Sequence, residues 1–259
     1  TDCNRISLLQ PAVPVPWWRT YGMGSMAKKQ KADVFHGLSN EIPFDLPRSI
    51  RKICTIHDVI FKEHPENYPF IDRNIYHAKV RYALHHADVI IATSEYTRER
   101  IQEFYPGDYD IRVVYQPVHP LYHQPLPEKI NRHERPYLIY HSGFNKRKNH
   151  LRLLDAFGMV MHEIPYDLVL VGFPGDTFDA VNRIASSPAF NGRVIIKNSV
   201  NTPELVELLS NASGFVYPSL TEGFGIPLAE AASCGLNAAV SDIDIFRELS
   251  GGTLLNFDP

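Results

Sequence analysis

The chain has 259 residues, of which 44% are hydrophobic and 21% are charged, and its formal net charge is −3. This composition is typical of a folded, water-soluble protein with one large or two ordinary domains, and it excludes disordered and fibrous classes. The small negative charge argues against a dedicated nucleic-acid binder, which would need a basic face.

The first 31 residues combine prolines, tryptophans and lysines. The prolines predict an extended connection over 10–16, and the residues after them predict a helix over 17–31. Aromatic rings beside lysines are typical of a peripheral contact with anionic lipid headgroups, here at the inner face of the membrane. The alternative is an ordinary helix packed through its tryptophans, with its lysines in solvent. The side chains concerned are Trp17, Trp18, Lys28, Lys29 and Lys31.

Short apolar runs then alternate with helical patterns. Strands are expected at 33–37, 52–56, 88–92 and 111–114, and a helix is expected at 72–87. Because ligands gather at the carboxyl ends of parallel strands, His36 and the His57-Asp58 pair are placed to reach one crevice, with His57 the stronger candidate.

Ser94 lies just beyond the strand 88–92 and precedes a helix that is expected to end at Phe104. Its hydroxyl suits an N-cap, which accepts a hydrogen bond from an otherwise unpaired backbone N–H group. Beyond 111–114, a proline-bearing polar stretch changes the composition as far as Arg135. We interpret 118–135 as a linker between an N-terminal domain, 1–117, and a C-terminal domain, 136–259.

The second half repeats the alternation of strands and helices. Strands are expected at 137–141, 167–172, 194–197 and 214–217, with helices over 150–163 and from Pro203 onward. Repeated units of this kind predict α/β domains with parallel sheets and right-handed crossovers.

A turn between a strand and a helix dominates the C-terminal part. Pro218 ends the strand, Gly223 and Gly225 keep the turn open, and Pro227 begins the helix. The first turn of a helix offers unpaired N–H groups to an anionic or hydroxyl-rich ligand. Two carboxylates, Glu222 and Glu230, flank this turn with seven residues between them.

A cationic loop, Ser142 to Asn149, joins the strand 137–141 to the next helix. A Lys-Arg-Lys run is usually a solvated surface loop, but this one lies after a strand and before a helix, in register with the Glu222 motif, which favours a role in the crevice for Arg147 and Lys148. The loop lacks the spacing of a P-loop, which disfavours an ATPase.

Two Asp-x-Asp pairs, Asp108 with Asp110 and Asp242 with Asp244, have the spacing that some enzymes use to hold a divalent metal. Asp108 is expected in a turn and Asp242 is expected to cap a helix, so metal chelation is disfavoured. The three cysteines lie far apart and suit neither a zinc site nor a disulfide framework, which favours a reducing compartment and a cytoplasmic protein.

The stretch Glu222-Gly-Phe-Gly-Ile-Pro-Leu-Ala-Glu230, preceded by Tyr-Pro-Ser and followed by Cys-Gly, resembles the signature of glycosyltransferase family 4. The segment 55–61 around His57, the segment 92–97 and the loop 142–149 are also similar to motifs of that family. The resemblance implies the GT-B fold, in which two Rossmann-like domains face each other across a cleft, and a retaining enzyme that uses nucleotide sugars. Family elements expected at both ends are missing, so we expect a fragment.

The resemblance also implies roles for individual residues. His57 would contact the donor sugar from the N-terminal domain, and Arg147 and Lys148 would neutralise the diphosphate, so no metal or other cofactor is expected. Glu222 would hold the donor sugar and Glu230 the ribose. Further donor-binding candidates are Gly143, which opens the cationic loop, Asn198, in the loop that frames the nucleobase, Ser94, if it faces the cleft rather than only capping its helix, and Gly223, Phe224, Gly225 and Ile226.

The function implied is transfer of a hexosyl unit from a nucleoside diphosphate to a saccharide or lipid-linked saccharide, as in the synthesis of cell-surface polysaccharides. Two alternatives remain open. Paired carboxylates also serve glycoside hydrolases, although a hydrolase has no diphosphate to justify Arg147 and Lys148. The other alternative is a non-catalytic module, because a fragment without the family's end elements would bind nucleotide sugars weakly and transfer nothing.

Overall fold

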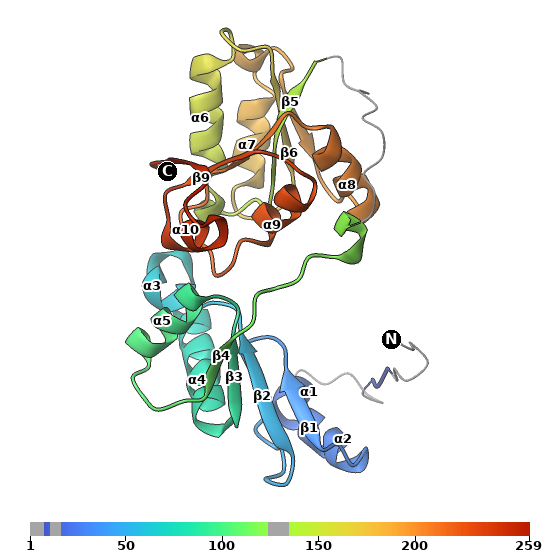
Figure 1. The fold of residues 1–259 in the computed structure, drawn as a ribbon, viewed down its shortest axis with the longest axis vertical. Coiled ribbons are helices and arrows are strands. Elements are labelled where there is room, and N and C mark those ends of the chain that lie inside the picture. Colours follow the sequence, from blue (N-terminus) through green and yellow to red (C-terminus); the bar gives the residue numbers. More distant parts are fainter. Residues whose placement is uncertain (1–7, 11–16, 124–134) are drawn as a thin grey trace.

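The computed structural model describes residues 8–10, 17–123 and 135–259, and it contains two parallel β-sheets in sequence order (Figure 1). The N-terminal sheet has the order β1-β2-β3-β4 and lies in the lower part of Figure 1. Its strands are β1 (Val34–Gly37), β2 (Arg51–Ile56), β3 (Val89–Ala92) and β4 (Ile111–Val113). The helices around it are α1 (Trp18–Tyr21), α2 (Met23–Lys29), α3 (Ile60–Glu63), α4 (Phe70–His86) and α5 (Glu95–Phe104).

The C-terminal sheet has the order β10-β9-β8-β5-β6-β7. Its strands are β5 (Tyr137–His141), β6 (Asp167–Val171), β7 (Val194–Lys197), β8 (Gly214–Tyr217), β9 (Ala238–Ser241) and β10 (Leu255–Phe257). The helices of this domain are α6 (His150–Val160), α7 (Phe178–Ala185), α8 (Thr202–Asn211), α9 (Ile226–Ser233) and α10 (Asp244–Ser250). Short 3₁₀ turns occur at η2 (Pro65–Asn67), η3 (Pro120–His123), η4 (Lys146–Lys148) and η5 (Pro188–Phe190).

Each sheet has its own hydrophobic core. Strands rich in β-branched residues, such as β3 and β6, are buried over most of their length because helices cover both faces of a parallel sheet. Fully buried side chains include Ile56 and Ile90 in the N-terminal core and Ile139, Leu168 and Phe215 in the C-terminal core. The expected fold class, α/β with two Rossmann-like domains, is confirmed.

The strand order of the C-terminal sheet decides where its loops meet. The chain runs outward from β5 through β6 to β7, then returns to the other side of β5 as β8 and continues outward through β9. Open α/β sheets bind ligands where the order reverses in this way, outside the carboxyl ends of the two strands. Here that point lies between β5 and β8, so the loops 142–149 and 218–225 become neighbours.

Three sequence predictions differ from the structure. The helix expected over 17–31 is two short helices, α1 and α2, joined at Gly22, and the helix expected over 150–163 ends at Val160. Asp242 does not cap α10, because its carboxylate pairs with Arg247 and the N-cap residue is Ile243. Most of the extended connection 10–16 and of the linker 118–135 lies outside the described residues.

Candidate functional site

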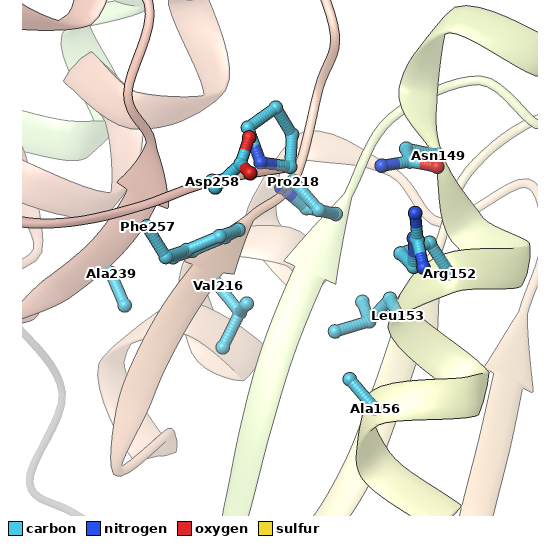
Figure 2. Close-up of a pocket in the computed structure, with 10 residues that line it drawn as sticks. Asn149, Arg152, Leu153, Ala156, Val216, Pro218, Ala239, Phe257 and Asp258 are labelled. Atoms are coloured by element: carbon cyan, nitrogen blue, oxygen red, sulfur yellow. The ribbon is translucent and has the colours of Figure 1, made fainter.

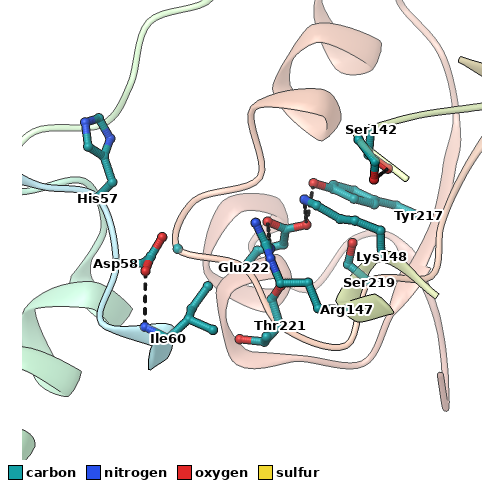
Figure 3. A network of polar contacts seen from close by, with 12 residues as sticks. His57, Asp58, Ile60, Ser142, Arg147, Lys148, Tyr217, Ser219, Thr221 and Glu222 are labelled. Atoms are coloured by element: carbon teal, nitrogen blue, oxygen red, sulfur yellow. Dashed lines mark hydrogen bonds and ion pairs between the residues drawn. The ribbon is translucent and has the colours of Figure 1, made fainter. Parts of the chain in front are cut away.

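The carboxylate of Glu222 forms the centre of a buried network of polar contacts at the reversal point of the sheet (Figure 3). Arg147 donates to one oxygen at 3.0 Å. The Lys148 ammonium and the Tyr217 hydroxyl both donate to the other oxygen, the tyrosine at 2.9 Å. Three of the four residues expected to be catalytic, Arg147, Lys148 and Glu222, are therefore in direct contact.

The charged side chains of this network are buried, and burial changes their pKa values. Glu222 is only 5% exposed and Lys148 only 7%. Burial by itself raises the pKa of the Glu222 carboxyl, but Lys148 and Arg147 outweigh burial and hold that pKa below its ordinary value. Burial lowers the pKa of Lys148, and the attraction of Glu222 only partly offsets it. Two cations face one carboxylate at this site.

Backbone contacts fix the two loops against each other. The Leu220 N–H group donates to the Arg147 carbonyl at 2.8 Å, and the Arg147 guanidinium donates to the Thr221 carbonyl at 3.0 Å. The Tyr140 hydroxyl, at the end of β5, donates to the Lys148 carbonyl at 3.0 Å. The cationic loop is therefore a fixed part of the site rather than a solvated surface loop.

The two glycines of the 218–225 loop are both required by its geometry. A Cβ atom on Gly223 would lie 2.3 Å from the carbonyl oxygen of His57, in the other domain. Gly225 has a φ of 97°, which side chains rarely permit, and it immediately precedes α9. The loop thus approaches the backbone of the N-terminal domain closely and then turns into the helix.

His57 lies beside this contact but its ring points away from the network (Figure 3). The imidazole Nε2 lies 2.6 Å from the Leu38 carbonyl, and Nδ1 lies 2.5 Å from the side-chain amide of Gln116. Asp58 faces the network from the same domain. Burial raises the pKa of Asp58, and the nearby Arg147 lowers it less.

Glu230 lies on α9, where its carboxylate is 3.1 Å from Nε2 of His141, the last residue of β5. Both side chains are mostly buried, with 14% and 10% exposed. Tyr122, in the segment between the sheets, also belongs to this group. Its pKa is raised by burial and by the Glu230 carboxylate. Glu230 is therefore held by neighbours of its own, His141 and Tyr122.

The remaining candidates are spread around this centre. Gly223, Phe224 and Gly225 are buried, while Gly143 and Ile226 are partly exposed. Asn198 is exposed in the loop after β7. Ser94 is fully buried. Its hydroxyl accepts a hydrogen bond from the Thr97 N–H group as an N-cap, and it lies 2.8 Å from the Gly223 carbonyl oxygen.

Two pockets flank the network. One of about 360 Å³ lies between η2 and the cationic loop, and one of about 220 Å³ includes Thr221 and Glu222. A pocket of about 450 Å³ lies elsewhere, between α6 and the strands β8 and β9 (Figure 2). None of the residues expected to be catalytic or donor-binding lines that pocket.

Sequence reasoning missed Tyr217, His141 and Tyr122 as members of the site. A signal was present for two of them, because His141 and Tyr217 are the last residues of adjacent parallel strands, the position that had singled out His57. For Tyr122 there was no such signal, since it lies between the two domains.

Comparison with known proteins finds glycosyltransferases. The model "Glycosyltransferase Family 4" matches residues 5–122, and "Glycosyl transferases group 1" matches residues 124–251. The O-antigen chain mannosyltransferase B of Escherichia coli is 30% identical over 87% of this chain and 61% of that protein. The O-antigen chain mannosyltransferase RfbU of Salmonella typhimurium is 26% identical over 81% of this chain and 57% of that protein.

Among solved structures, Anabaena HepE in complex with UDP and glucose matches with a TM-score of 0.68 and 18% identity, over 81% of this chain and 58% of that one. The chain spans about three fifths of the length of each of the two mannosyltransferases named above. No helix in the described parts of the chain has the length and apolarity to cross a membrane. The residues matched by the two family models adjoin each other. Together with the Glu222 to Glu230 signature, these matches identify the chain as a member of glycosyltransferase family 4.

Proposed function

We propose that this chain forms the catalytic part of a glycosyltransferase that moves a mannosyl unit from a nucleoside diphosphate to a saccharide or lipid-linked saccharide. The observation that carries the proposal is the pair of mostly buried cations, Arg147 and Lys148, on the Glu222 carboxylate. Two cations held in place at a buried site favour an anionic ligand. A diphosphate is an anion of the required kind.

The two cations have a direct role in the proposed reaction. The bond between the anomeric carbon and the diphosphate oxygen breaks, and the leaving diphosphate takes the electron pair. Arg147 can meet the resulting charge with a forked pair of hydrogen bonds and Lys148 with a point charge. Because these groups supply the positive charge, the proposed reaction needs no metal.

We propose retention of configuration. An acceptor hydroxyl attacks the anomeric carbon from the face that the diphosphate leaves, and its proton passes to a leaving phosphate oxygen. The ionised Glu222 accepts hydrogen bonds from sugar hydroxyls and keeps the two cations oriented. The mostly buried cations Arg147 and Lys148 disfavour the hydrolase alternative, because a hydrolase has no diphosphate for them to neutralise.

Neighbouring residues would bind the other parts of the donor. Glu230 is placed one helical turn inside α9 and would accept hydrogen bonds from the ribose hydroxyls. The exposed loop around Asn198 would frame the nucleobase. His57 would reach the sugar only after its ring leaves the Leu38 carbonyl and Gln116. The choice of mannose rests on the two O-antigen mannosyltransferases that the chain resembles.

Release of nucleoside diphosphate from GDP-mannose and UDP-mannose, with and without a mannose-containing oligosaccharide, tests this proposal in EDTA. We expect acceptor-dependent release from one donor. Lys148→Ala should abolish it, and Lys146→Ala, which removes an exposed cation from the same loop, should not. Donor binding without release would favour the non-catalytic module.

We also propose a peripheral membrane contact through α1 and α2. Trp17 is 70% exposed and Tyr21 is 57% exposed, and Lys28, Lys29 and Lys31 are exposed nearby. Aromatic rings and lysines in this combination suit an anionic bilayer surface. Sedimentation with vesicles that contain phosphatidylglycerol, and not with neutral vesicles, should show binding that is lost in Trp17→Ala. Equal sedimentation of this variant would contradict the contact.

A further inference from the structure

The carbonyl of Gly223 is held by two hydroxyl groups of the other domain. The Ser94 hydroxyl lies 2.8 Å from this carbonyl oxygen and the Thr97 hydroxyl lies 3.0 Å from it. Ser94 is 0% exposed and Thr97 is 1% exposed, so water does not compete for these bonds. A carbonyl oxygen has two lone pairs and can accept both.

Glu248 makes a second contact to the same part of the N-terminal domain. Its two carboxylate oxygens accept from the backbone N–H groups of Glu95 and Tyr96, each at 2.8 Å. These are the first two residues of α5, where N–H groups lack partners within the helix and the helix dipole favours a negative charge. A hydrogen bond to Glu248 also raises the pKa of Tyr115, which follows β4.

Packing between the loop 222–226 and α10 connects the two contacts within the C-terminal domain. Glu248 belongs to α10, and a Cβ atom on Gly225 would lie 2.9 Å from the ring of Phe246 on that helix. The loop 222–226 and α10 therefore pack as one unit. The start of α5 holds this unit at two points, the Gly223 carbonyl and the Glu248 carboxylate.

We propose that Thr97, which acts from the N-terminal domain, and Glu248, which joins α10 to that domain, are positioning residues that fix the loop 222–226. This inference deepens the proposed function, because that loop is the one placed to hold the donor sugar. Neither side chain needs to touch the donor. Together they give the loop its binding shape only while the two domains are in contact, so that donor binding and domain contact strengthen each other.

Hydrogen–deuterium exchange of the whole 259-residue chain tests the proposal without any substrate. Thr97→Val removes the hydroxyl at nearly constant shape, and Glu248→Gln removes the charge. Because charged and buried hydrogen bonds are lost, both variants should raise exchange of the amides in 222–226 by about tenfold or more. Thr97→Ser should restore the wild-type rate. Glu99→Gln, which removes the same charge from an exposed position on α5, should stay within about twofold of wild type.

A purely structural role predicts a different pattern. If Glu248 only caps α5, Glu248→Gln will raise exchange in the first turn of α5 and leave 222–226 at the wild-type rate, and the proposal is then overturned. Glu248 is partly exposed, so this variant is expected to fold. Calorimetry with UDP and GDP separates the two proposals. Failure of the wild type to bind either nucleotide would count against the proposed function, while the exchange rates would still decide the positioning role.

Discussion

Lys148 and Glu222 are 74 positions apart in sequence and share a buried ion pair at the carboxyl ends of β5 and β8. Removing one partner leaves the other charge buried, which is costly. We expect Lys148→Met to destabilise the C-terminal domain by about 2–4 kcal/mol, with Arg147 limiting the loss. Urea denaturation should measure it. The double variant Lys148→Met/Glu222→Gln should be more stable than the single variant, and a double variant that is less stable would contradict the pairing.

His150 should make the protein sensitive to mild acid. Burial and the charge of Lys148 lower its pKa from 6.5 to about 3. Below pH 6.5 His150 therefore binds a proton in the unfolded chain but not in the folded chain. The free energy of unfolding falls as pH decreases through this range. Between pH 7 and pH 5 the loss should be about 2 kcal/mol.

Denaturation at several pH values checks this expectation. His150→Phe should remove most of the loss between pH 7 and pH 5, and His162→Phe, at an exposed position, should keep it. The lowered pKa of Glu222 affects stability in a more acidic pH range. The stabilisation that it gives is present above the ordinary pKa of 4.5 and is lost as pH falls below that value. An unchanged pH profile in His150→Phe would count against a buried neutral imidazole.

Gly223→Ala should disturb the contact between the domains more than the domains themselves. The new methyl group would lie 2.3 Å from the His57 carbonyl and 2.6 Å from Cβ of Asp58, so one domain must move away. Small-angle scattering should show a larger radius of gyration than in the wild type. Gly158→Ala is the matched control, because its methyl group would lie at an ordinary 3.5 Å from Phe190. Equal radii for the two variants would contradict the close approach.

Glu230 should recognise the ribose of the bound nucleotide. Glu230→Gln removes a charged acceptor, and we expect about tenfold weaker binding of the preferred nucleoside diphosphate. The same nucleotide without its 2′ and 3′ hydroxyls should bind the wild type and the variant equally. If calorimetry finds that the variant also weakens binding of the dideoxy nucleotide tenfold, Glu230 acts elsewhere.

Sequence patterns were sufficient for the alternation of strands and helices, the fold class and the N-cap at Ser94. They were insufficient for the contact between Lys148 and Glu222, because that contact depends on β8 returning to the free side of β5. Alternation along the chain leaves strand order undetermined.

Other misses have local causes. Asp242 was expected to cap a helix, but its carboxylate pairs with Arg247 and Ile243 is at the N-cap. Glu248 caps a helix of the other domain, and such a cap has no characteristic spacing in the sequence.

Binding of UDP and GDP to the 259-residue chain in EDTA, compared between wild type, Lys148→Ala and Lys146→Ala, tests the central claim most directly. The proposed site predicts that one nucleotide binds without metal, that Lys148→Ala weakens it by about tenfold or more, and that Lys146→Ala does not. Equal affinities for all three proteins, or binding that requires a divalent metal, would contradict the assignment of the diphosphate to Arg147 and Lys148.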